Sequence, residues 1–200
     1  MYAMKLNADI KNYMESQGGV LTAADMRLLG FSRGLLHVYT RAGLLERYGC
    51  GAYISPGSLV DDMAYMQRKF PSIIFSHESA LYLNSLSERT PFRHSVTIPS
   101  TSTLPRSLAE ICSSYYIKPH LHKLGLTQLP TTMGNPVRCY NAERCICDIL
   151  RSKNRVGIEC FTSALKQYFS AKEKNLNLLA EYASILGVTE KLTPYLEVLI

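Results

Sequence analysis

Apolar residues recur with helical spacing in three segments near the start of the chain. The first covers residues 5–17, where Ile10 and Met14 fall one turn apart on a single apolar stripe. A short second segment covers residues 23–29, and a third covers residues 32–42 and stops at a glycine. Three helices in this order are what a helix-turn-helix requires.

Local signals mark the starts of these helices and a hairpin after the third. Thr22 stands as an N-cap with Asp25 three residues later, which is the spacing of a capping box, and Ser32 caps the third helix. Two short extended runs, residues 44–48 and 52–55, then flank a glycine-rich turn. This hairpin has the form of a wing, so the sequence predicts a winged helix-turn-helix that binds DNA.

The rest of the chain predicts a second, larger domain. A connecting helix over residues 58–70 ends before a proline. Apolar and β-branched runs then predict a small sheet with one helix at residues 77–85, the strands being 72–75, 94–98, 115–118, 123–129 and 136–140. From residue 142 the period is helical, with segments at 142–152, 157–169, 174–186 and 189–199. The predicted fold class is α+β, with a winged helix at residues 1–70 and a mixed α+β domain with a helical C-terminal layer at residues 71–200.

The third helix carries the candidate DNA contacts. Arg33, His37 and Arg41 recur every four residues, with Thr40 beside them, and form a polar basic face. The opposite, core-facing side is predicted to hold Leu35, Val38, Tyr39 and Ala42. Arginine can bond guanine edges or neutralise phosphates, and side chains on the wing can hold the flanking backbone. The predicted DNA-binding residues are Ser32, Arg33, His37, Thr40, Arg41, Arg47 and Tyr48.

Composition and charge are consistent with this interpretation. Apolar residues make up 46% and charged residues 19% of the chain, which is enough apolar surface for real cores. The net charge of +6 favours polyanionic partners only weakly. Neither a membrane-spanning apolar stretch nor a signal-peptide pattern is found, so we expect a cytoplasmic protein that does not act at a membrane. Most of the six cysteines are interpreted as reduced, small apolar core residues.

Two clusters suggest chemistry that their spacing does not support. Cys139, Cys145 and Cys147 suggest a zinc site with His120 and His122 as further ligands, but Cys145 and Cys147 are two apart on a predicted helix and diverge too far to share one metal. Ser76 precedes His77 and a glutamate, yet adjacent residues point apart, so Ser76 is better interpreted as a helix cap. Nucleotide-binding and zinc-protease motifs are absent. We therefore expect no enzymatic activity, no catalytic residues, no metal and no cofactor.

A second basic region lies in the first of the C-terminal helices and the loop after it. Arg144, Asp148 and Arg151 lie on one helical face and predict an exposed ladder of opposite charges. Arg151, Lys153 and Arg155 place three basic side chains within five residues. This loop is therefore a second candidate anion-binding region.

Three stretches together resemble the AbiEi antitoxin family of bacterial type IV toxin–antitoxin systems, which also act in abortive phage infection. They are residues 43–47 with 51–53 (GLLER, GAY), residues 75–83 with 86–91 (FSHESALYL, LSERTP) and residues 140–151 (YNAERCICDILR). The first is generic to winged helices, whereas the other two are long and distinctive. Cys145 replaces an expected threonine, and Cys50 stands where a valine would be ordinary, but neither touches the basic stripe.

The resemblance implies a repressor that binds operator inverted repeats of its own promoter in double-stranded DNA. It also implies that the C-terminal domain neutralises a nucleotidyltransferase-like toxin without forming a stable complex with it. Candidate residues for antitoxicity, or for a second basic surface, are His77, Arg89, Arg144, Arg151, Lys153 and Arg155.

Other functions stay open from the sequence. The chain is alternatively a winged-helix regulator unrelated to a toxin, a module whose winged helix contacts protein, or a DNA-binding domain fused to a nuclease. A nuclease needs clustered acidic residues on strands to hold magnesium, and the predicted strands between residues 72 and 140 contain none.

Overall fold

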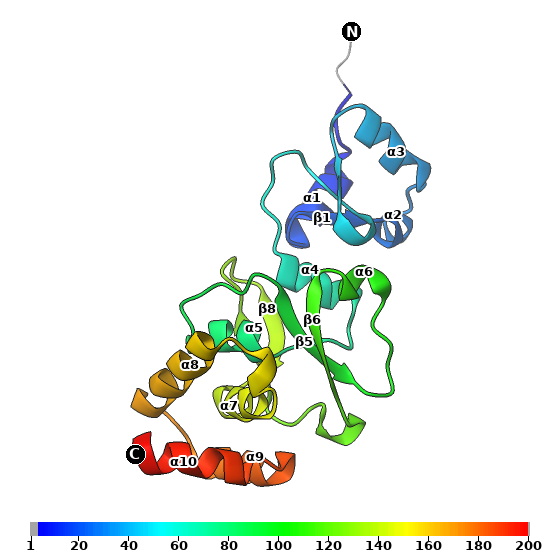
Figure 1. The fold of residues 1–200 in the computed structure, drawn as a ribbon. Helices are drawn as coiled ribbons and strands as arrows, with labels where there is room; N and C mark the ends of the chain where they lie inside the picture. The colour runs from blue at the N-terminus through cyan, green and yellow to red at the C-terminus, as the bar shows by residue number, and fades with distance from the viewer. Residues whose placement is uncertain (1–3, 200) are drawn as a thin grey trace. The chain divides into compact units, whose positions relative to one another are not determined.

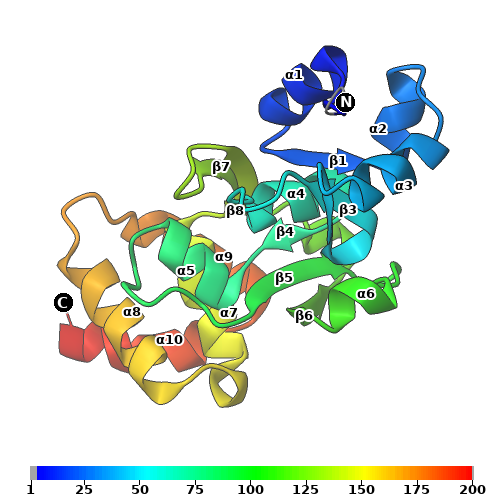
Figure 2. The ribbon, with the colours of Figure 1, turned by 90° about the horizontal axis from the view of Figure 1, so that it is seen from above.

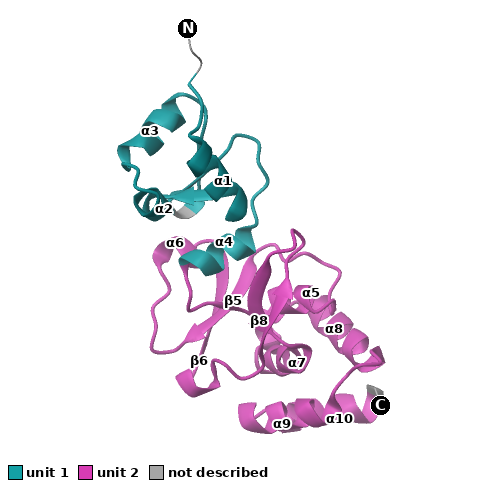
Figure 3. Ribbon diagram, turned by 180° about the vertical axis from the view of Figure 1, so that it is seen from behind, with its two compact units in different colours: residues 1–69 teal, residues 70–200 magenta. Residues whose placement is uncertain are grey.

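The protein, described from a computed structural model, is a mixed α+β chain with two sheets. The structure describes residues 4–199, without the side chains of Cys50 and Leu199. The chain forms two compact units, Met1–Lys69 and Phe70–Ile200, which are described separately (Figures 1 and 3). Within residues 4–199, none of the helices combines the length and the apolar character needed to cross a membrane.

The first unit combines four helices with a three-stranded antiparallel sheet. Its elements are α1 (Ala8–Ser16), β1 (Val20–Thr22), α2 (Ala23–Leu28), α3 (Gly34–Arg41), β2 (Glu46–Tyr48), the 3-10 turn η1 (Gly49–Gly51), β3 (Ala52–Ile54) and α4 (Asp62–Lys69). The strand order is β1-β3-β2, with Val20 opposite Ile54 and Arg47 opposite Tyr53. Strand β1 was not predicted, and α4 begins four residues later than expected.

The predicted capping box at the start of α2 is present. The Thr22 side chain accepts from the Asp25 backbone N–H, and an Asp25 carboxylate oxygen accepts from the Thr22 backbone N–H at 2.8 Å. Asp25 also accepts from the Tyr13 hydroxyl at 2.9 Å and from Arg68 Nη2 at 2.6 Å. One carboxylate therefore ties α1, α2 and α4 together.

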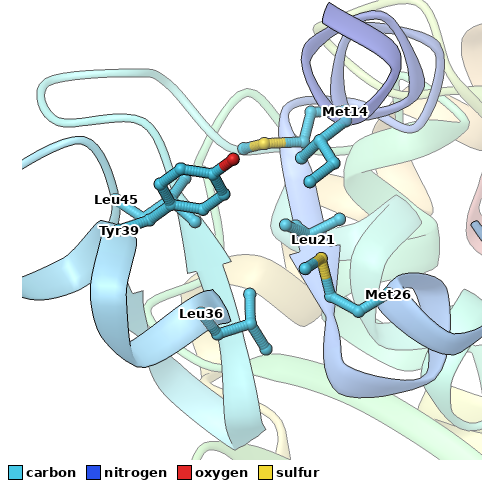
Figure 4. Close-up of a cluster of buried hydrophobic side chains, with 7 residues drawn as sticks. Met14, Leu21, Met26, Leu36, Tyr39 and Leu45 are labelled. Carbon is cyan, nitrogen blue, oxygen red and sulfur yellow. The ribbon is translucent and has the colours of Figure 1, made fainter. Parts of the chain in front are cut away.

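The core of the first unit fixes which face of α3 is exposed. The cluster of buried side chains comprises Ile10, Met14, Leu21, Met26, Leu36, Tyr39 and Leu45 (Figure 4). The predicted inner face of α3 is partly wrong, because Val38 is 43% exposed and Ala42 is exposed, whereas Leu36 is buried. Leu36 and Tyr39 are three residues apart, which defines a narrower inner stripe than the one predicted.

The second unit is built on a five-stranded mixed sheet in the order β6-β5-β4-β8-β7 (Figure 2). Its strands are β4 (Ile74–Phe75), β5 (His94–Pro99), β6 (Cys112–Ile117), β7 (Leu126–Pro130) and β8 (Pro136–Tyr140). Strand β4 runs parallel to β8 and antiparallel to β5, while β5 and β6 are parallel. All five strands were predicted, with boundaries shifted by up to three residues.

Helices cover this sheet and form a further layer beyond it. They are α5 (His77–Leu83), α6 (Arg106–Ala109), α7 (Ala142–Arg151), α8 (Ile158–Ser170), α9 (Leu176–Leu186) and α10 (Thr189–Leu199), with 3-10 turns η2 (Pro119–Leu121) and η3 (Lys153–Arg155). Helix α5 packs on β5 and β8, and α7 contacts α5, α8, α9 and α10. Helices α9 and α10 lie beyond α7, away from the sheet (Figures 1 and 3). Helix α7 is thus the central helix of this unit.

The start of α7 approaches a loop so closely that only glycine fits there. Gly125 has φ +72°, and a Cβ built on it would lie 2.6 Å from Arg144 Cβ and 2.9 Å from Asn141 Oδ1. The Gly125 carbonyl accepts from the Asn141 backbone N–H at 2.8 Å. The absent side chain therefore lets the loop before β7 pack directly on the first turn of α7.

Four of the five cysteines whose side chains are described are core residues, as predicted. Cys112, Cys139, Cys145 and Cys147 are buried, and Cys160 is half-buried. Burial raises the pKa of the Cys139 and Cys147 thiols to about 12. These thiols are therefore protonated near neutral pH and pack as small apolar groups.

Candidate nucleic-acid interface and an arginine pocket

A basic stripe consisting of Arg33, His37 and Arg41 runs along the outer side of α3. All three residues are exposed, on the side opposite the buried Leu36 and Tyr39. Arg33 precedes the helix but has helical backbone angles (φ −56°, ψ −30°), so the four-residue spacing holds through all three positions. The sequence prediction that these side chains share one exposed face is confirmed.

Two other residues predicted to contact DNA have hydroxyls bonded within the unit. The Thr40 hydroxyl donates to the Leu36 carbonyl of its own helix at 2.7 Å, and the residue is half-buried. The exposed Ser32 uses its Oγ to accept from the Gly34 backbone N–H at 3.1 Å. Ser32 thus organises the start of α3, although Arg33 and not Ser32 occupies the N-cap position.

The β2–β3 hairpin offers one basic side chain. Arg47 is exposed on β2. The half-buried Tyr48 donates its hydroxyl to Asp62, and its ring packs edge-on against Tyr65 at a centroid separation of 6.2 Å. Tyr48 therefore connects the hairpin to α4, and the outward basic group of the hairpin is Arg47.

The second unit contains a small cavity that we name the arginine pocket. It has a volume of about 170 Å³ and lies between β5, β6, the first residue of α5, and α7 with the turn after it. Three arginines and one carboxylate are among its lining residues, which are His77, Thr97, Tyr115, Tyr116, Ile117, Arg144, Asp148, Arg151, Ser152 and Arg155.

Arg144 is fully buried and holds a charge in the interior. Its Nε donates to Asp148 Oδ1 at 3.1 Å, and its Nη1 donates to the carbonyls of Leu121 and Leu124 at 3.1 and 2.9 Å. Its Cζ lies 4.2 Å from the centroid of the Tyr140 ring, within cation–π range. Within the described residues, Nη2 is buried and has no hydrogen-bond partner. One charged donor of this side chain is left unused.

The acidic partner of Arg144 is incompletely satisfied as well. Asp148 is buried, and its Oδ1 also lies 3.8 Å from Arg151 Nη1. Within the described residues, its Oδ2 has no hydrogen-bond partner. Burial raises the pKa of Asp148, and the Arg144 guanidinium opposes that rise.

The predicted exposed charge ladder on α7 is therefore wrong. Arg144 and Asp148 are buried, and only Arg151 reaches solvent, with 36% of its side chain exposed. The reason is that α7 lies among α5, α8, α9 and α10, so every residue from Glu143 to Leu150 is buried. A central helix has no solvent face on which a polar stripe could lie.

His77 lines the arginine pocket and has a strained backbone conformation. It is buried and has φ +47°, which is uncommon for a residue other than glycine. Its ring nitrogens lie 3.0 Å from Ser76 Oγ and 3.2 Å from Ser152 Oγ, and its ring stacks on Tyr115 at a centroid separation of 3.4 Å. Burial lowers the pKa of His77 well below its ordinary value, and the nearby Arg155 lowers it further. The imidazole is therefore neutral at physiological pH.

Ser76 has a different role from the one predicted. It occupies the N-cap position of α5, but its side chain makes no capping hydrogen bond. Its Oγ instead accepts from the Thr97 hydroxyl at 2.8 Å and contacts His77. The Ser76 hydroxyl therefore contacts Thr97 and a ring nitrogen of His77 instead of capping α5.

The structure brings together four of the six residues proposed for antitoxicity or a second basic surface. His77, Arg144, Arg151 and Arg155 line the arginine pocket, where Arg155 Cζ lies 4.0 Å from the centroid of the Tyr115 ring. The other two residues make their contacts elsewhere in the unit.

Lys153 and Arg89 are the two candidate residues that do not line the arginine pocket. The Lys153 ammonium donates to the Tyr195 hydroxyl at 3.2 Å and lies 5.2 Å from the centroid of the Phe161 ring. Arg89 forms an exposed ion pair with Glu159 at 2.9 Å, beside a separate cavity of about 610 Å³.

Sequence reasoning missed Tyr115 and Ser152, which complete the pocket. Tyr115 lay in a predicted strand, but nothing local indicated that its ring would lie between a histidine and an arginine. Within residues 4–199, no group of three or more His, Cys, Asp or Glu side chains is arranged to hold a metal ion.

No family model matches the sequence, and no curated protein matches it. Among solved structures, the chain is similar to one described as "Crystal structure of RV2827C protein from Mycobacterium tuberculosis". The TM-score is 0.66 at 15% sequence identity, and the match covers 88% of this chain and 70% of the mycobacterial chain. At this identity the likeness concerns the fold alone.

Proposed function

We propose that the first unit is a winged helix that binds DNA with α3 in the major groove. The order of its elements, helix, strand, helix, helix, strand, strand, is the order expected of such a domain, with the β2–β3 hairpin as the wing. The observation that carries the proposal is the basic stripe of Arg33, His37 and Arg41 on the exposed side of a helix whose other side is fixed in the core.

In this proposal the stripe reads bases and the wing holds the flanking backbone. Arg33 and Arg41 offer planar guanidinium groups that can bond guanine O6 and N7 or phosphate oxygens. Arg47 lies on the hairpin, where it would meet a phosphate. Residues 1–57 contain six basic and four acidic side chains, so one copy supplies little general attraction for DNA. Two copies on inverted repeats would double the contacts.

We further propose that the protein is an AbiEi-like antitoxin that represses its own operon. The support is the resemblance of residues 75–91 and 140–151 to that family. In this proposal the second unit counters a nucleotidyltransferase-like toxin without a lasting complex, while the first unit regulates transcription.

The test of DNA binding compares three forms of the full chain on the DNA upstream of its own gene, across a salt series. They are the wild type, an Arg33→Ala/Arg41→Ala variant, and a control that removes the same charge from other exposed positions, Lys11→Ala/Arg106→Ala. We expect the stripe variant to lose at least about tenfold in affinity, and its salt slope to fall by about 0.9 for each phosphate contact removed. The control should bind like the wild type.

Equal loss in both variants would mean that only net charge matters and that α3 does not recognise DNA. Unchanged binding by the stripe variant would instead favour a winged helix that contacts protein.

Antitoxicity is tested separately by expressing the stripe variant together with the co-encoded toxin. Because the proposal assigns antitoxicity to the second unit, this variant should restore growth as well as the wild type does. Continued growth arrest, despite equal amounts of folded protein, would contradict the assignment.

A further inference from the structure

Beside the basic stripe, α3 carries a second exposed row of residues that are small and uncharged. Gly34, Val38 and Ala42 follow each other every four residues, so at about 3.6 residues per turn they fall on one line along the helix, next to the line of the stripe. All three are exposed, whereas Leu36 and Tyr39 point into the core (Figure 4). The exposed side of α3 therefore combines the basic stripe with this uncharged row.

Val38 has the largest side chain of the uncharged row and is 43% exposed. Helical side chains lean toward the N-terminus of their helix, so Val38 covers the turn that contains Gly34. Its neighbours in the row do not cover it in return, since Gly34 has no side chain and Ala42 has a single methyl group. The methyl groups of Val38 are therefore accessible to a surface that packs on α3.

The fold itself does not require glycine at position 34. Gly34 belongs to α3, and its φ is not positive. Apart from its chain neighbours and the backbone of its own helix, a Cβ at this position would meet one described atom within 4 Å, Ser32 Oγ at 3.4 Å, which is ordinary contact. Glycine is less favourable than alanine in a helix, but it allows the backbone to approach a ligand closely. Gly34 therefore indicates a close approach beside Val38.

The major groove of DNA contains an apolar group that suits an exposed valine. Thymine presents its C5-methyl group there, beside the O4 acceptor, and small apolar side chains recognise thymine by packing against this methyl group. The neighbouring basic stripe supplies the groups that bond guanine edges and phosphates. The two rows together match a groove that offers acceptor atoms, phosphates and methyl groups.

We propose that Val38 recognises thymine in the DNA bound by the first unit, by packing its methyl groups against the C5-methyl group, and that Gly34 lets the backbone of α3 approach closely enough for this contact. The inference rests on the proposed DNA binding and adds a contact that determines sequence specificity. Burying one methyl-sized group changes affinity by about fourfold, so the contact is large enough to measure.

The test uses the DNA upstream of the protein's own gene, made once with thymine and once with uracil in its place. Uracil pairs like thymine but lacks the C5-methyl group. Fluorescence anisotropy of labelled DNA gives the affinities of the full-length protein for both DNAs at one salt concentration. We expect the wild type to bind the thymine DNA at least about fourfold more tightly than the uracil DNA, and Val38→Ala to prefer it by less than about twofold. Any change in DNA shape caused by uracil affects both proteins and cancels in the comparison.

Val198→Ala is the matched control for the loss of methyl groups. It makes the same change at a valine of α10 that is 80% exposed in the second unit, and it should keep the wild-type preference for thymine.

Gly34→Ala tests the close approach of the backbone. The variant should resist urea at least as well as the wild type, because alanine is the better helix residue. It should nevertheless bind the thymine DNA about tenfold or more weakly, because the added Cβ would hold α3 away from the base edges. A purely structural role of Gly34 would not lower affinity while stability is kept.

Each outcome separates this inference from the proposed function. No binding of the wild type to the thymine DNA would overturn the proposed DNA binding and this inference together. Equal affinity of the wild type for both DNAs would overturn the inference alone. A preference for thymine that Val38→Ala retains, or that Val198→Ala loses to the same extent, would overturn it too, and unchanged affinity of Gly34→Ala would exclude the close approach.

Discussion

Replacing Gly125 by alanine measures how tightly α7 is held against the loop before β7. The new Cβ would lie 2.6 Å from Arg144 Cβ, which is attached directly to the α7 backbone, and 2.9 Å from Asn141 Oδ1, which is held by its capping hydrogen bond with the Arg144 backbone N–H. Forcing extra atoms into a packed site costs about 1–3 kcal/mol. The left-handed backbone at φ +72° adds about 1 kcal/mol for alanine, part of which is offset by a stiffer unfolded chain. We expect a total destabilisation of about 2–4 kcal/mol.

Gly134→Ala is the matched control for this substitution. Gly134 has φ +84° in the turn between β7 and β8, and a Cβ there would meet nothing within 4 Å. Alanine at position 134 has the same unfavourable positive φ but makes no close contact. The difference in the free energy of unfolding between the two variants is therefore the cost of the contact that the new Cβ makes with α7 at position 125, about 1–3 kcal/mol. Urea unfolding followed by circular dichroism gives the stabilities, since the chain has no tryptophan for fluorescence.

Hydrogen exchange places the effect within the structure. Amides of α7 should exchange faster in Gly125→Ala than in Gly134→Ala, because the first turn of α7 loses its close support. Equal stabilities of the two variants would refute the reasoning, since they would show that the loop and helix can move apart at no cost.

Two further predictions concern a cap and a buried histidine. Thr22→Ala should lower the free energy of unfolding by about 1 kcal/mol, measured by urea titration, because it removes the capping hydroxyl of α2, while Thr22→Ser should keep most of it. A loss as large in Thr22→Ser would exclude the hydroxyl as the cause. His77 is neutral when folded, and its folded pKa lies below its unfolded value of about 6.5. The contribution of His77 to the free energy of unfolding is therefore complete above about pH 6.5. At lower pH this contribution decreases by up to about 1.4 kcal/mol per pH unit. Asparagine tolerates positive φ, so we expect His77→Asn to fold and to reduce the dependence of the free energy of unfolding on pH between about pH 5 and 6.5. An unchanged slope would show that other groups cause the dependence on pH.

Local sequence patterns predicted most elements because those elements carry their own signals. The capping box at Thr22 and the periodic segments from residue 142 onward depend on neighbours within a few positions. Strand β1 was missed because its three residues pair with β3, where Val20 faces Ile54 from 34 positions away. So short a segment has no period of its own.

The site was predictable only as far as it lies on one element. The basic stripe was found because helical spacing places Arg33, His37 and Arg41 together. The arginine pocket was not, because it forms where α7, the start of α5 and strand β6 meet, and that meeting results from the sheet order. The burial of Arg144 likewise comes from helices that lie later in the chain.

The pairing of β4 has a consequence for how the chain matures as it is made. Phe75 in β4 lies opposite Cys139 in β8, so one edge of this two-residue strand lacks its partner until 64 more residues have been added. At about 5–20 residues per second, ribosomes need roughly 3–13 s for that distance. The first unit ends at Lys69, so its internal contacts require none of the residues that are synthesised during this time. Synthesis therefore yields a finished N-terminal unit seconds before the second unit can assemble, and a slow or interrupted ribosome would leave β4 exposed to pairing with other nascent chains.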